Sequence, residues 1–362
     1  MTDLEKARQK INEIDCEMAR LFTERMNAVK KVAEYKRLHG LQVTDSVREA
    51  ENLKRNSKLI EDESLKSYYV NFLQSNMEIS KNYQHRLLEG MRVAFSGVEG
   101  AFANIAAKKV FPDSVAAAYP DFKAAYNSVV DGECDCVILP IENSYNGDVG
   151  QVMDLAFFGS LYINGIYDIS VIQNLLVNKG TVMDDIKTVI SHPQALGQCA
   201  GYIKKHGFKA VEAVNTAVAA KMVAESGRKD IAAIASEEAA DIFGLKKIEA
   251  HINESNNNTT RFAVFSRTAK TPSVSDNNFI LLFTVTNEAG SLGKAISIIG
   301  DNGFNLKALK SRPTKELVWN YYFFAEGEGN INSPQGKQML GELKTKCSEI
   351  KVIGYYEKEV SL

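Results

Sequence analysis

The first stretch of the chain carries an apolar residue at every third or fourth position. These positions are Leu4, Ala7, Ile11, Ile14, Met18, Leu21, Ala28, Val32 and Tyr35. Such spacing predicts one long amphipathic helix from residue 4 to about residue 38, with a seam like that of a coiled coil. His39-Gly40 is then expected to end the helix.

Two further helices are expected after this one. Asp45 or Ser46 can cap the second, with Glu49 inside its first turn, and the third should run from about Ser64 to Leu88. Three helices in so short a region cannot easily close a hydrophobic core by themselves. We therefore expect this region to pair with a second copy of the chain.

The whole chain is long for one domain and has balanced charge. Its 362 residues favour two or three domains. A total of 43 Lys and Arg against 45 Asp and Glu leaves a net charge of -2, so no basic field exists to hold nucleic acid or an anionic membrane. No apolar run is long enough to span a bilayer, and no signal peptide is recognisable at the amino terminus.

The five cysteines are odd in number and lack paired CxxC spacing. Cys134-Asp135-Cys136 is only a weak metal motif, and the pattern fits a reducing compartment. We expect a cytoplasmic protein without metal or cofactor.

One charged residue, Arg25, interrupts the apolar seam. Lys36 follows about three turns and roughly 16 Å further along the helix, so both cations overlook the same groove. On the third helix, Ser80 and Gln84 are four residues apart and share one polar face. The alternative explanation for Arg25 is a buried ion pair that sets the register of the helices.

Eight polar residues of this region, in their order and spacing, resemble the all-helical chorismate mutases over residues 4–88. They are Arg8, Arg25, Lys36, Asp45, Arg48, Glu49, Ser80 and Gln84. The resemblance implies a dimer that converts chorismate to prephenate, with Lys36 and Gln84 as catalytic groups on the breaking ether oxygen. It further implies arginines on the two substrate carboxylates and Glu49 on the substrate hydroxyl. A unimolecular rearrangement of this kind needs neither a nucleophile nor a metal.

Arg8 cannot serve the same site as the other cations of its own helix. It lies about 25 Å along the helix from Arg25 and about 42 Å from Lys36, at 1.5 Å per residue. We expect Arg8 to reach the site of a partner chain.

From Met91 onward, short predicted strands alternate with helices. The repeated units are Arg92–Ser96 with Phe102–Phe111, Lys187–Ser191 with Ala195–His206, and Ile231–Ala235 with Ser236–Phe243. Alternation of this kind predicts parallel sheets with ligand at the strand ends, and two such lobes with a cleft between them.

Four polar stretches are expected to project into this cleft. They are Pro140–Gly147, Ser191–Ala195, Asn215–Ala217 and Asn256–Phe262, the last being a loop that leads into strand Phe262–Phe265. Each has an ordinary explanation as well: Thr216 can cap a helix, His192 can be a hydrogen-bonded loop residue, and Asn and Thr cluster at turns.

Taken as a set, these stretches resemble prephenate dehydratase over about residues 91–267. The resemblance implies a two-lobed fold like that of periplasmic binding proteins, in which prephenate loses carbon dioxide and hydroxide to give phenylpyruvate. Thr260 would be the catalytic residue at the leaving hydroxyl. The residues implied in substrate binding are Glu142, Asn143, Ser144, Ser191, Gln198, Thr216 and Arg261. The chain departs from the family at Asn215, where serine is usual, and at Ala101 and Ala103, where Thr and Ser are common.

A third pattern begins after a polar linker over residues 269–278. Strands and helices are expected in the order βαββαβ, which predicts a ferredoxin-like sandwich. The expected ranges are Phe279–Thr286, Gly290–Gly303, Asn305–Ser311, Val318–Glu326, Ser333–Cys347 and Lys351–Glu357.

This last region resembles ACT regulatory domains. The resemblance implies an effector site formed by Gly290, Ser291, Leu292, Ser311, Arg312 and Pro313. Lys310 stands where that family carries a glutamate. The expected effector is phenylalanine.

The sequence thus predicts a multidomain protein. Its parts are an all-α chorismate mutase domain at residues 1–90, an α/β dehydratase domain at 91–268 and an α+β ACT domain at 277–362. We expect a homodimer or homotetramer that acts on chorismate and then prephenate in phenylalanine synthesis. The alternative is a non-catalytic two-lobed ligand sensor, since ACT domains only bind and two-lobed clefts often do.

Overall fold

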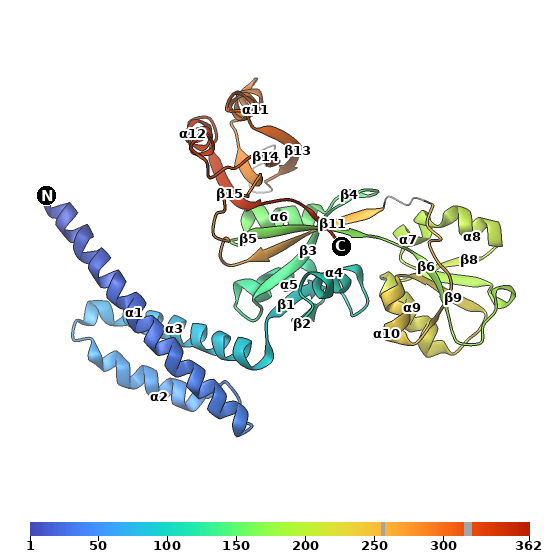
Figure 1. The fold of residues 1–362 in the computed structure, drawn as a ribbon, viewed down its shortest axis with the longest axis horizontal. Coiled ribbons are helices and arrows are strands. Elements are labelled where there is room, and N and C mark those ends of the chain that lie inside the picture. The colour runs from blue at the N-terminus through green and yellow to red at the C-terminus, as the bar shows by residue number, and fades with distance from the viewer. Residues whose placement is uncertain (255–257, 315–320) are drawn as a thin grey trace. The chain divides into compact units, whose positions relative to one another are not determined.

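The computed structural model describes residues 1–254, 258–314 and 321–362. They form two compact units, Met1–Arg92 and Val93–Leu362 (Figure 1). The domain boundaries expected at residue 90 and between residues 268 and 277 stay predictions, and both sides of the second boundary belong to the second unit.

The first unit is entirely helical, as predicted. Its elements are α1 Asp3–Leu38, α2 Ser46–Asn56, the 3-10 turn η1 Ser57–Leu59, and α3 Glu63–Glu89. Thr2 and Glu5 form a capping box that starts α1. Asp45 caps α2 by accepting a hydrogen bond from the Arg48 backbone N–H at 3.1 Å.

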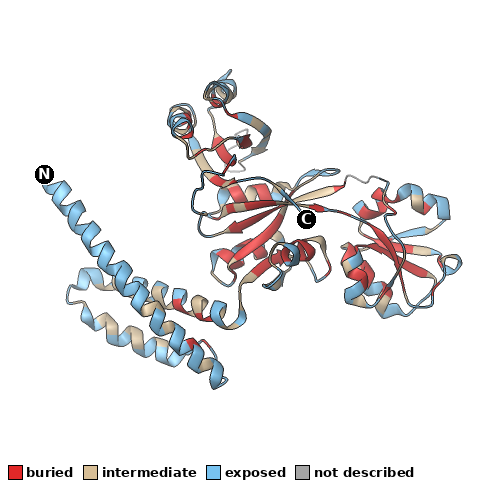
Figure 2. Cartoon of the chain, viewed as in Figure 1, coloured by how far each residue is buried: buried red, intermediate tan, exposed pale blue. Residues whose placement is uncertain are grey.

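The apolar seam of α1 is exposed within one chain (Figure 2). Leu4, Ile11 and Leu21, for example, are each at least half exposed. The only buried residue of α1 is Ala33. A seam of this length left in water is costly, so the pattern that predicted the helix also predicts a second copy to cover it.

The second unit begins with a lobe built on a mixed sheet. Its strands are β1 Arg92–Ser96, β2 Val115–Tyr119, β3 Cys136–Asn143, β4 Gly147–Asp148, β5 Tyr162–Ser170 and β11 Thr259–Ser266. Its helices are α4 Phe102–Val110, α5 Phe122–Val130 and α6 Gly150–Phe158.

A second lobe is inserted between β5 and β11. Its strands are β6 Asn174–Val177, β7 Thr188–Ser191, β8 Lys209–Glu212, β9 Ile231–Ala235 and β10 Lys246–Glu249, in the order β10-β6-β9-β7-β8. Its helices are α7 Pro193–Gln198, α8 Ala200–His206, α9 Thr216–Ser226 and α10 Glu237–Phe243, with a 3-10 turn η2 at Met183–Asp185.

The expectation of parallel sheets holds for only part of each lobe. β1 and β3 are parallel, and so are β7, β8 and β9. In contrast, β11 runs antiparallel to both β3 and β5, and β6 runs antiparallel to β9. The difference arises where the chain crosses between the lobes, because a strand that returns from the second lobe enters the first sheet from the opposite end.

Two other boundaries differ from the predictions. The helix expected at Ala195–His206 breaks at Cys199 into α7 and α8. The polar stretch before Phe262 is not a loop throughout, since β11 already begins at Thr259. Asn256 and Asn257 lie outside the described residues.

The last part of the chain has the predicted βαββαβ order. Its elements are β12 Asn278–Thr284, α11 Ser291–Asp301, β13 Asn305–Pro313, β14 Tyr321–Glu328, α12 Pro334–Leu343 and β15 Glu349–Tyr356, followed by a short β16 at Val360–Ser361. The four main strands lie in the antiparallel order β13-β14-β12-β15, as in a ferredoxin-like sandwich.

This ferredoxin-like part continues the sheet of the first lobe. The full order is β13-β14-β12-β15-β5-β11-β3-β1-β2. The junction is the pairing of Gly354 with Ile163, where a Cβ on Gly354 would lie 2.5 Å from the Ile163 carbonyl oxygen. A glycine is needed here for the two backbones to approach.

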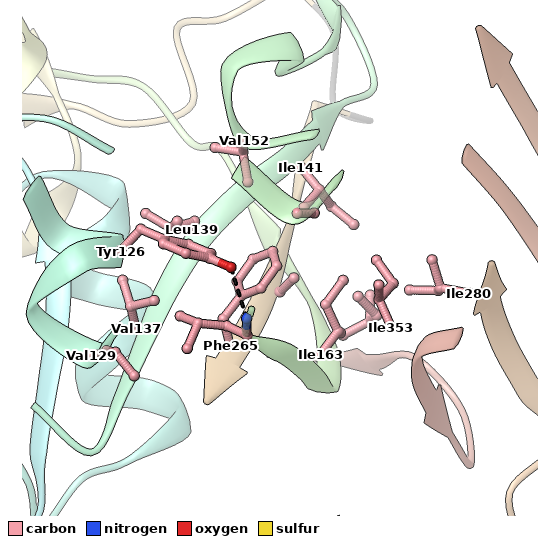
Figure 3. Packing of buried hydrophobic residues seen from close by; sticks show 14 of the residues in the cluster. Tyr126, Val129, Val137, Leu139, Ile141, Val152, Ile163, Phe265, Ile280 and Ile353 are labelled. Carbon is pink, nitrogen blue, oxygen red and sulfur yellow. Dashed lines mark hydrogen bonds between the residues drawn. The ribbon is translucent and has the colours of Figure 1, made fainter. Parts of the chain in front are cut away.

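One hydrophobic core spans this junction (Figure 3). Tyr126 and Phe265 of the first lobe meet edge to face at 5.9 Å, and Ile163 carries the same cluster to Ile280 and Ile353 of the ferredoxin-like part. The Tyr126 hydroxyl accepts a hydrogen bond from the buried Leu161 N–H at 2.9 Å.

Among the residues that the structure describes, no helix is both long and apolar enough to span a membrane.

Candidate active sites

The helical unit contains a pocket of about 180 Å³ between its three helices. It brings together most of the residues predicted for the mutase site, namely Arg25, Lys36, Asp45, Arg48, Glu49, Ser80 and Gln84. The remaining walls are largely apolar and include Val29 and Met77. Arg8 does not line this pocket and is exposed on α1.

Two cations of α1, Arg25 and Lys36, line the pocket. Arg25 donates to the Ser80 hydroxyl and, at 3.2 Å, to the Asn76 carbonyl oxygen. Lys36 donates to the Val43 carbonyl oxygen at 2.5 Å. Burial lowers the pKa of Arg25 but leaves it a cation, because a guanidinium loses its proton only far above neutral pH. Arg25 makes no ion pair with any described residue, so the structure does not support the alternative of a register-setting pair.

Gln84 lines this pocket with a buried polar side chain. Its side chain is 7% exposed, and its Nε2 donates to the Ser80 carbonyl oxygen at 3.3 Å. Its Oε1 is buried with no hydrogen-bond partner among the described residues. A buried amide left partly unpaired is costly, which indicates that the pocket is built for a polar ligand.

Lys81, which was not predicted from the sequence, also lines this pocket. Its ammonium group pairs with Glu49 at 3.3 Å and with Glu78 at 2.9 Å. The hydrogen bond that Lys81 donates to Glu78 is the main reason that the pKa of Lys81 is raised. Lys81 directly follows Ser80, so its position beside a predicted site residue could have drawn attention to it.

A larger pocket of about 570 Å³ lies between the two lobes of the second unit. Both lobes contribute walls, as the two-lobed prediction requires. Four of the predicted dehydratase residues line it, namely Asn143, Gln198, Thr216 and Thr260. Ala101 and Ala103 line it as well, so the two departures from the family pattern make this wall apolar. Asn215 caps α9 by accepting from the Val218 N–H at 2.8 Å, a role that serine could also perform.

Thr260 is held at this pocket by its neighbour across the sheet. Asn143 on β3 pairs with Thr260 on β11, and its amide nitrogen donates to the Thr260 hydroxyl oxygen at 2.9 Å. Ser144 and Thr259 join the same ends of the two strands by two hydrogen bonds. The Thr259 backbone N–H donates to the Ser144 hydroxyl oxygen, and the Ser144 backbone N–H donates to the Thr259 carbonyl oxygen, both at 2.9 Å.

Arg261 points away from the pocket, because neighbouring strand residues face opposite sides of a sheet. Its guanidinium forms two hydrogen bonds with the Glu326 carboxylate, at 2.8 and 2.9 Å. Further carboxylates nearby are Glu359 at 3.0 Å, Glu142 at 3.4 Å and Asp168 at 3.7 Å. Glu142 therefore also lies outside the pocket lining.

Burial and pairing oppose each other in this cluster. Burial by itself lowers the pKa of Arg261, but the hydrogen bonds and charge of Glu326 outweigh it and raise that pKa. Likewise, burial by itself raises the pKa of Glu326, and Arg261 brings it below its usual range. The pair is therefore ionised at neutral pH and ties β11 to β14.

Two predicted residues of the second lobe have clear structural roles. Ser191 is fully buried and donates to the Ile234 carbonyl oxygen at 2.6 Å, so it joins β7 to β9 and does not line the pocket. His192 caps α7, accepting from the Gln194 N–H at 3.3 Å. Gln173 also lines the pocket, although it was not predicted from the sequence. It is 1% exposed, and its Oε1 has no hydrogen-bond partner among the described residues. No repeated pattern marks it in the sequence.

The predicted effector residues lie at two places in the ferredoxin-like part. Gly290 starts α11 with φ +82°, and Ser291 and Leu292 follow in its first turn. Ser311, Arg312 and Pro313 lie at the end of β13, which extends two residues beyond the expected strand Asn305–Ser311. Arg312 pairs with Asp154 of α6 at 2.8 Å, and Lys310 pairs with Glu142 at 2.9 Å and Asp148 at 2.5 Å.

Comparison with known families supports both halves of this description. Residues 7–85 match the family "chorismate mutase type II", and residues 93–270 match the family "prephenate dehydratase".

Curated relatives cover nearly the whole chain. A "bifunctional chorismate mutase/prephenate dehydratase" of Buchnera aphidicola is 31% identical over 97% of this chain and 96% of its own length. A relative of the same description from Aquifex aeolicus is 30% identical over 99% of both chains. Among solved structures, one described as a novel type of quorum quenching acylase, GqqA, is 29% identical with a TM-score of 0.69, covering 75% of this chain and 98% of that one.

Proposed function

This chain belongs to the family of bifunctional chorismate mutase/prephenate dehydratases, and from that premise we propose which residues carry out each reaction. The enzyme rearranges chorismate to prephenate and then dehydrates and decarboxylates prephenate to phenylpyruvate, two consecutive steps of phenylalanine synthesis. The observation that carries the proposal is the presence of two separate pockets, one lined by the Arg25, Lys36 and Gln84 set and the other by Thr260.

The mutase reaction is assigned to the helical pocket. Lys36 and Gln84 bind the ether oxygen as its bond to carbon breaks, while Arg25 and Arg48 bind carboxylates and Glu49 the hydroxyl. The rearrangement is unimolecular, so catalysis consists of holding the reactive conformer and stabilising developing negative charge. Charge-assisted hydrogen bonds of about 1.5–3 kcal/mol each can supply most of the barrier reduction.

We also propose that two chains complete each mutase site. A pocket of about 180 Å³ is small for a substrate of this size, since ligand sites commonly measure about 300–1,000 Å³. Arg8 is exposed on α1 and directly follows the seam residue Ala7, so a second copy packed on the seam would lie close to it. Arg8 of one chain then binds a substrate carboxylate in the site of its partner, within a homodimer or homotetramer.

The dehydratase reaction is assigned to the pocket between the lobes. Electrons of the breaking C–C bond to the carboxylate form the aromatic ring, and those of the breaking C–O bond leave with hydroxide. Thr260 donates a hydrogen bond to that departing oxygen. Gln198 and Thr216 bind the substrate. Glu142, Ser144, Ser191 and Arg261 act outside direct contact, by holding the strands and loops that present the pocket.

The ferredoxin-like part is proposed to be an ACT domain that senses phenylalanine. Gly290 leaves open space at the start of α11, where the charged ends of an amino acid can approach the backbone. Lys310 forms an ion pair with Asp148, and the guanidinium of Arg312, which pairs with Asp154, lies against Gly150. Asp148 and Gly150 both line the dehydratase pocket. An effector that shifts β13 can therefore change the shape of the dehydratase pocket.

We further propose that the enzyme is located in the cytoplasm.

The main competitor, a non-catalytic sensor, shares the two-lobed form, and the fold alone does not select a chemistry. The experiment that separates the alternatives is to give purified protein chorismate and to measure prephenate and phenylpyruvate over time. The proposal predicts both products, with prephenate appearing first. Binding of either compound without turnover would support a sensor, and activity only on amide substrates would support an acylase.

A further inference from the structure

We infer that Asn143 is a positioning residue that makes the Thr260 hydroxyl a hydrogen-bond donor aimed into the dehydratase pocket. The inference deepens the proposed function and rests on the role proposed there for Thr260. It replaces direct substrate binding, the role that the family resemblance implied for Asn143.

The hydrogen bonds around Asn143 determine which way its amide points. Its Oδ1 accepts from the backbone N–H groups of Tyr145 and Asn146, both at 3.0 Å, and from the Asn146 side chain at 3.2 Å. Its Nδ2 faces three acceptors, the Thr260 hydroxyl oxygen at 2.9 Å, Asn258 Oδ1 at 2.8 Å and the Thr259 carbonyl oxygen at 3.2 Å. A rotated amide would place donors against donors, so this orientation is strongly preferred.

The same contacts leave Asn143 little capacity for a substrate. An amide nitrogen has two hydrogens, and three protein acceptors already surround this one. The amide oxygen accepts three hydrogen bonds from the protein. Asn143 therefore lines the pocket but is occupied by the loop and strand that carry Thr260.

For Thr260 the consequence is a defined direction of donation. Its oxygen accepts from Asn143, and its hydroxyl donates to no other described residue. Because Thr260 lines the pocket, its hydrogen can be directed to the substrate. A hydrogen bond received by a hydroxyl oxygen also makes its O–H a better donor, since it stabilises the negative charge that develops as the hydrogen is shared.

A double-mutant cycle in the full-length enzyme tests this inference. Asn143→Ala should lower kcat for prephenate more than about tenfold and change KM less than about twofold. In the Thr260→Ala background, the same change should cause almost no additional loss, because its effect passes through a hydroxyl that is absent. Equal fold losses in both backgrounds, or a raised KM with unchanged kcat, would overturn the inference.

A second variant keeps the test decisive if Asn143→Ala folds poorly. Asn143→Asp retains the shape, but its carboxylate only accepts, so it draws the Thr260 hydrogen away from the substrate. Its kcat should be low at neutral pH and rise toward acid pH, up to about tenfold per pH unit, as the protonated carboxyl regains a donor. A pH profile parallel to that of the wild type would contradict the inference.

Asn164→Ala provides the matched control. Asn164 lies on β5 of the same sheet and donates to Ser266 Oγ at 2.5 Å and to the Thr268 carbonyl oxygen at 2.9 Å, outside the substrate pocket. Its kcat should stay near the wild-type value. The two proposals can be rejected separately. Full turnover in Thr260→Ala rejects the catalytic role of Thr260. Independent effects of the two substitutions reject only the positioning role of Asn143.

Discussion

The two compact units differ sharply in how much they bury (Figure 2). Between Met1 and Arg92 only Ala33, Val43, Ser80 and Gln84 are buried, and two of these four are polar residues of the pocket. The unit Val93–Leu362 contains continuous apolar clusters around both of its sheets.

The comparison indicates that one chain can build the dehydratase site but not the whole mutase site. The long α1 leaves its apolar seam exposed, and we propose that the helical unit needs a partner for both its core and its site. The α/β unit encloses its pocket with its own two lobes. Mutase activity should therefore depend on association of chains, and dehydratase chemistry should depend on contacts within one chain.

The largest effect should come from dividing the mutase site between two variants. Arg8→Ala and Lys36→Ala should each lower mutase activity by about 10²–10³-fold, since each removes a charged group from the transition state. Mixed and allowed to exchange subunits, they should recover about a quarter of wild-type activity, because half of the dimers are mixed and each has one intact site. No recovery despite proven exchange would show that Arg8 serves its own chain.

A second prediction concerns stability of the α/β unit. Glu326→Gln should destabilise this unit by about 3–5 kcal/mol, because it leaves the buried Arg261 guanidinium incompletely paired. Thermal unfolding of the full chain measures the change. The control is Glu328→Gln on the same strand, whose exposed carboxylate pairs with Asn305 at 2.9 Å and should matter by less than about 0.5 kcal/mol.

The same pair predicts a pH dependence. The pKa of Glu326 is lower in the folded protein than its usual value, so its stabilisation is present above the unfolded value of about 4.3 and is lost as the pH falls through the folded value. At pH values below about 4, the melting temperature of the α/β unit should therefore decrease as the pH falls, and it should decrease less steeply in Glu326→Gln. If the melting temperatures of the wild type and of Glu326→Gln decrease equally with pH, the Arg261–Glu326 pair does not contribute to the loss of stability in acid.

A third prediction tests the ether-binding role of Gln84. Gln84→Glu should make mutase activity rise toward acid pH, by up to about tenfold per pH unit, because a carboxyl group donates only while protonated. Dehydratase activity, measured with prephenate, should keep the wild-type pH profile. If the mutase activity of Gln84→Glu does not change with pH, Gln84 does not bind the ether oxygen.

The smallest expected effect concerns regulation. Gly290→Ala should raise the phenylalanine concentration for half-inhibition of the dehydratase by about fivefold or more, within the usual range of allosteric coupling. Gly303→Ala is the matched control, because Gly303 ends the same helix region with φ +83° and equally open space, so it adds the same backbone strain. Equal effects of both variants would exclude the α11 turn as the effector site.

The sequence predicted the elements of this fold well where periodicity was strong. The helix over residues 4–38, the strand Ile231–Ala235 and the βαββαβ order all agree with the structure. It failed where packing between distant segments decides the outcome. Strand direction between the lobes, and continuation of the first sheet into β15, depend on how the chain crosses, and residue spacing carries no information about that.

The site residues show the same limit. The motifs located both pockets but could not tell which side chains face them. Thr260 and Arg261 are adjacent, yet one lines the pocket and the other pairs with Glu326 across the sheet. That difference follows from β11 beginning at Thr259, which residue composition did not indicate, since Asn and Thr favour turns.

The central claim is that one chain performs two reactions at two separate sites. The most direct test supplies chorismate to Thr260→Ala and follows prephenate and phenylpyruvate. We predict that prephenate forms at the wild-type rate and accumulates, with phenylpyruvate slower by more than about tenfold. Undiminished phenylpyruvate formation, or loss of prephenate formation together with it, would contradict the account.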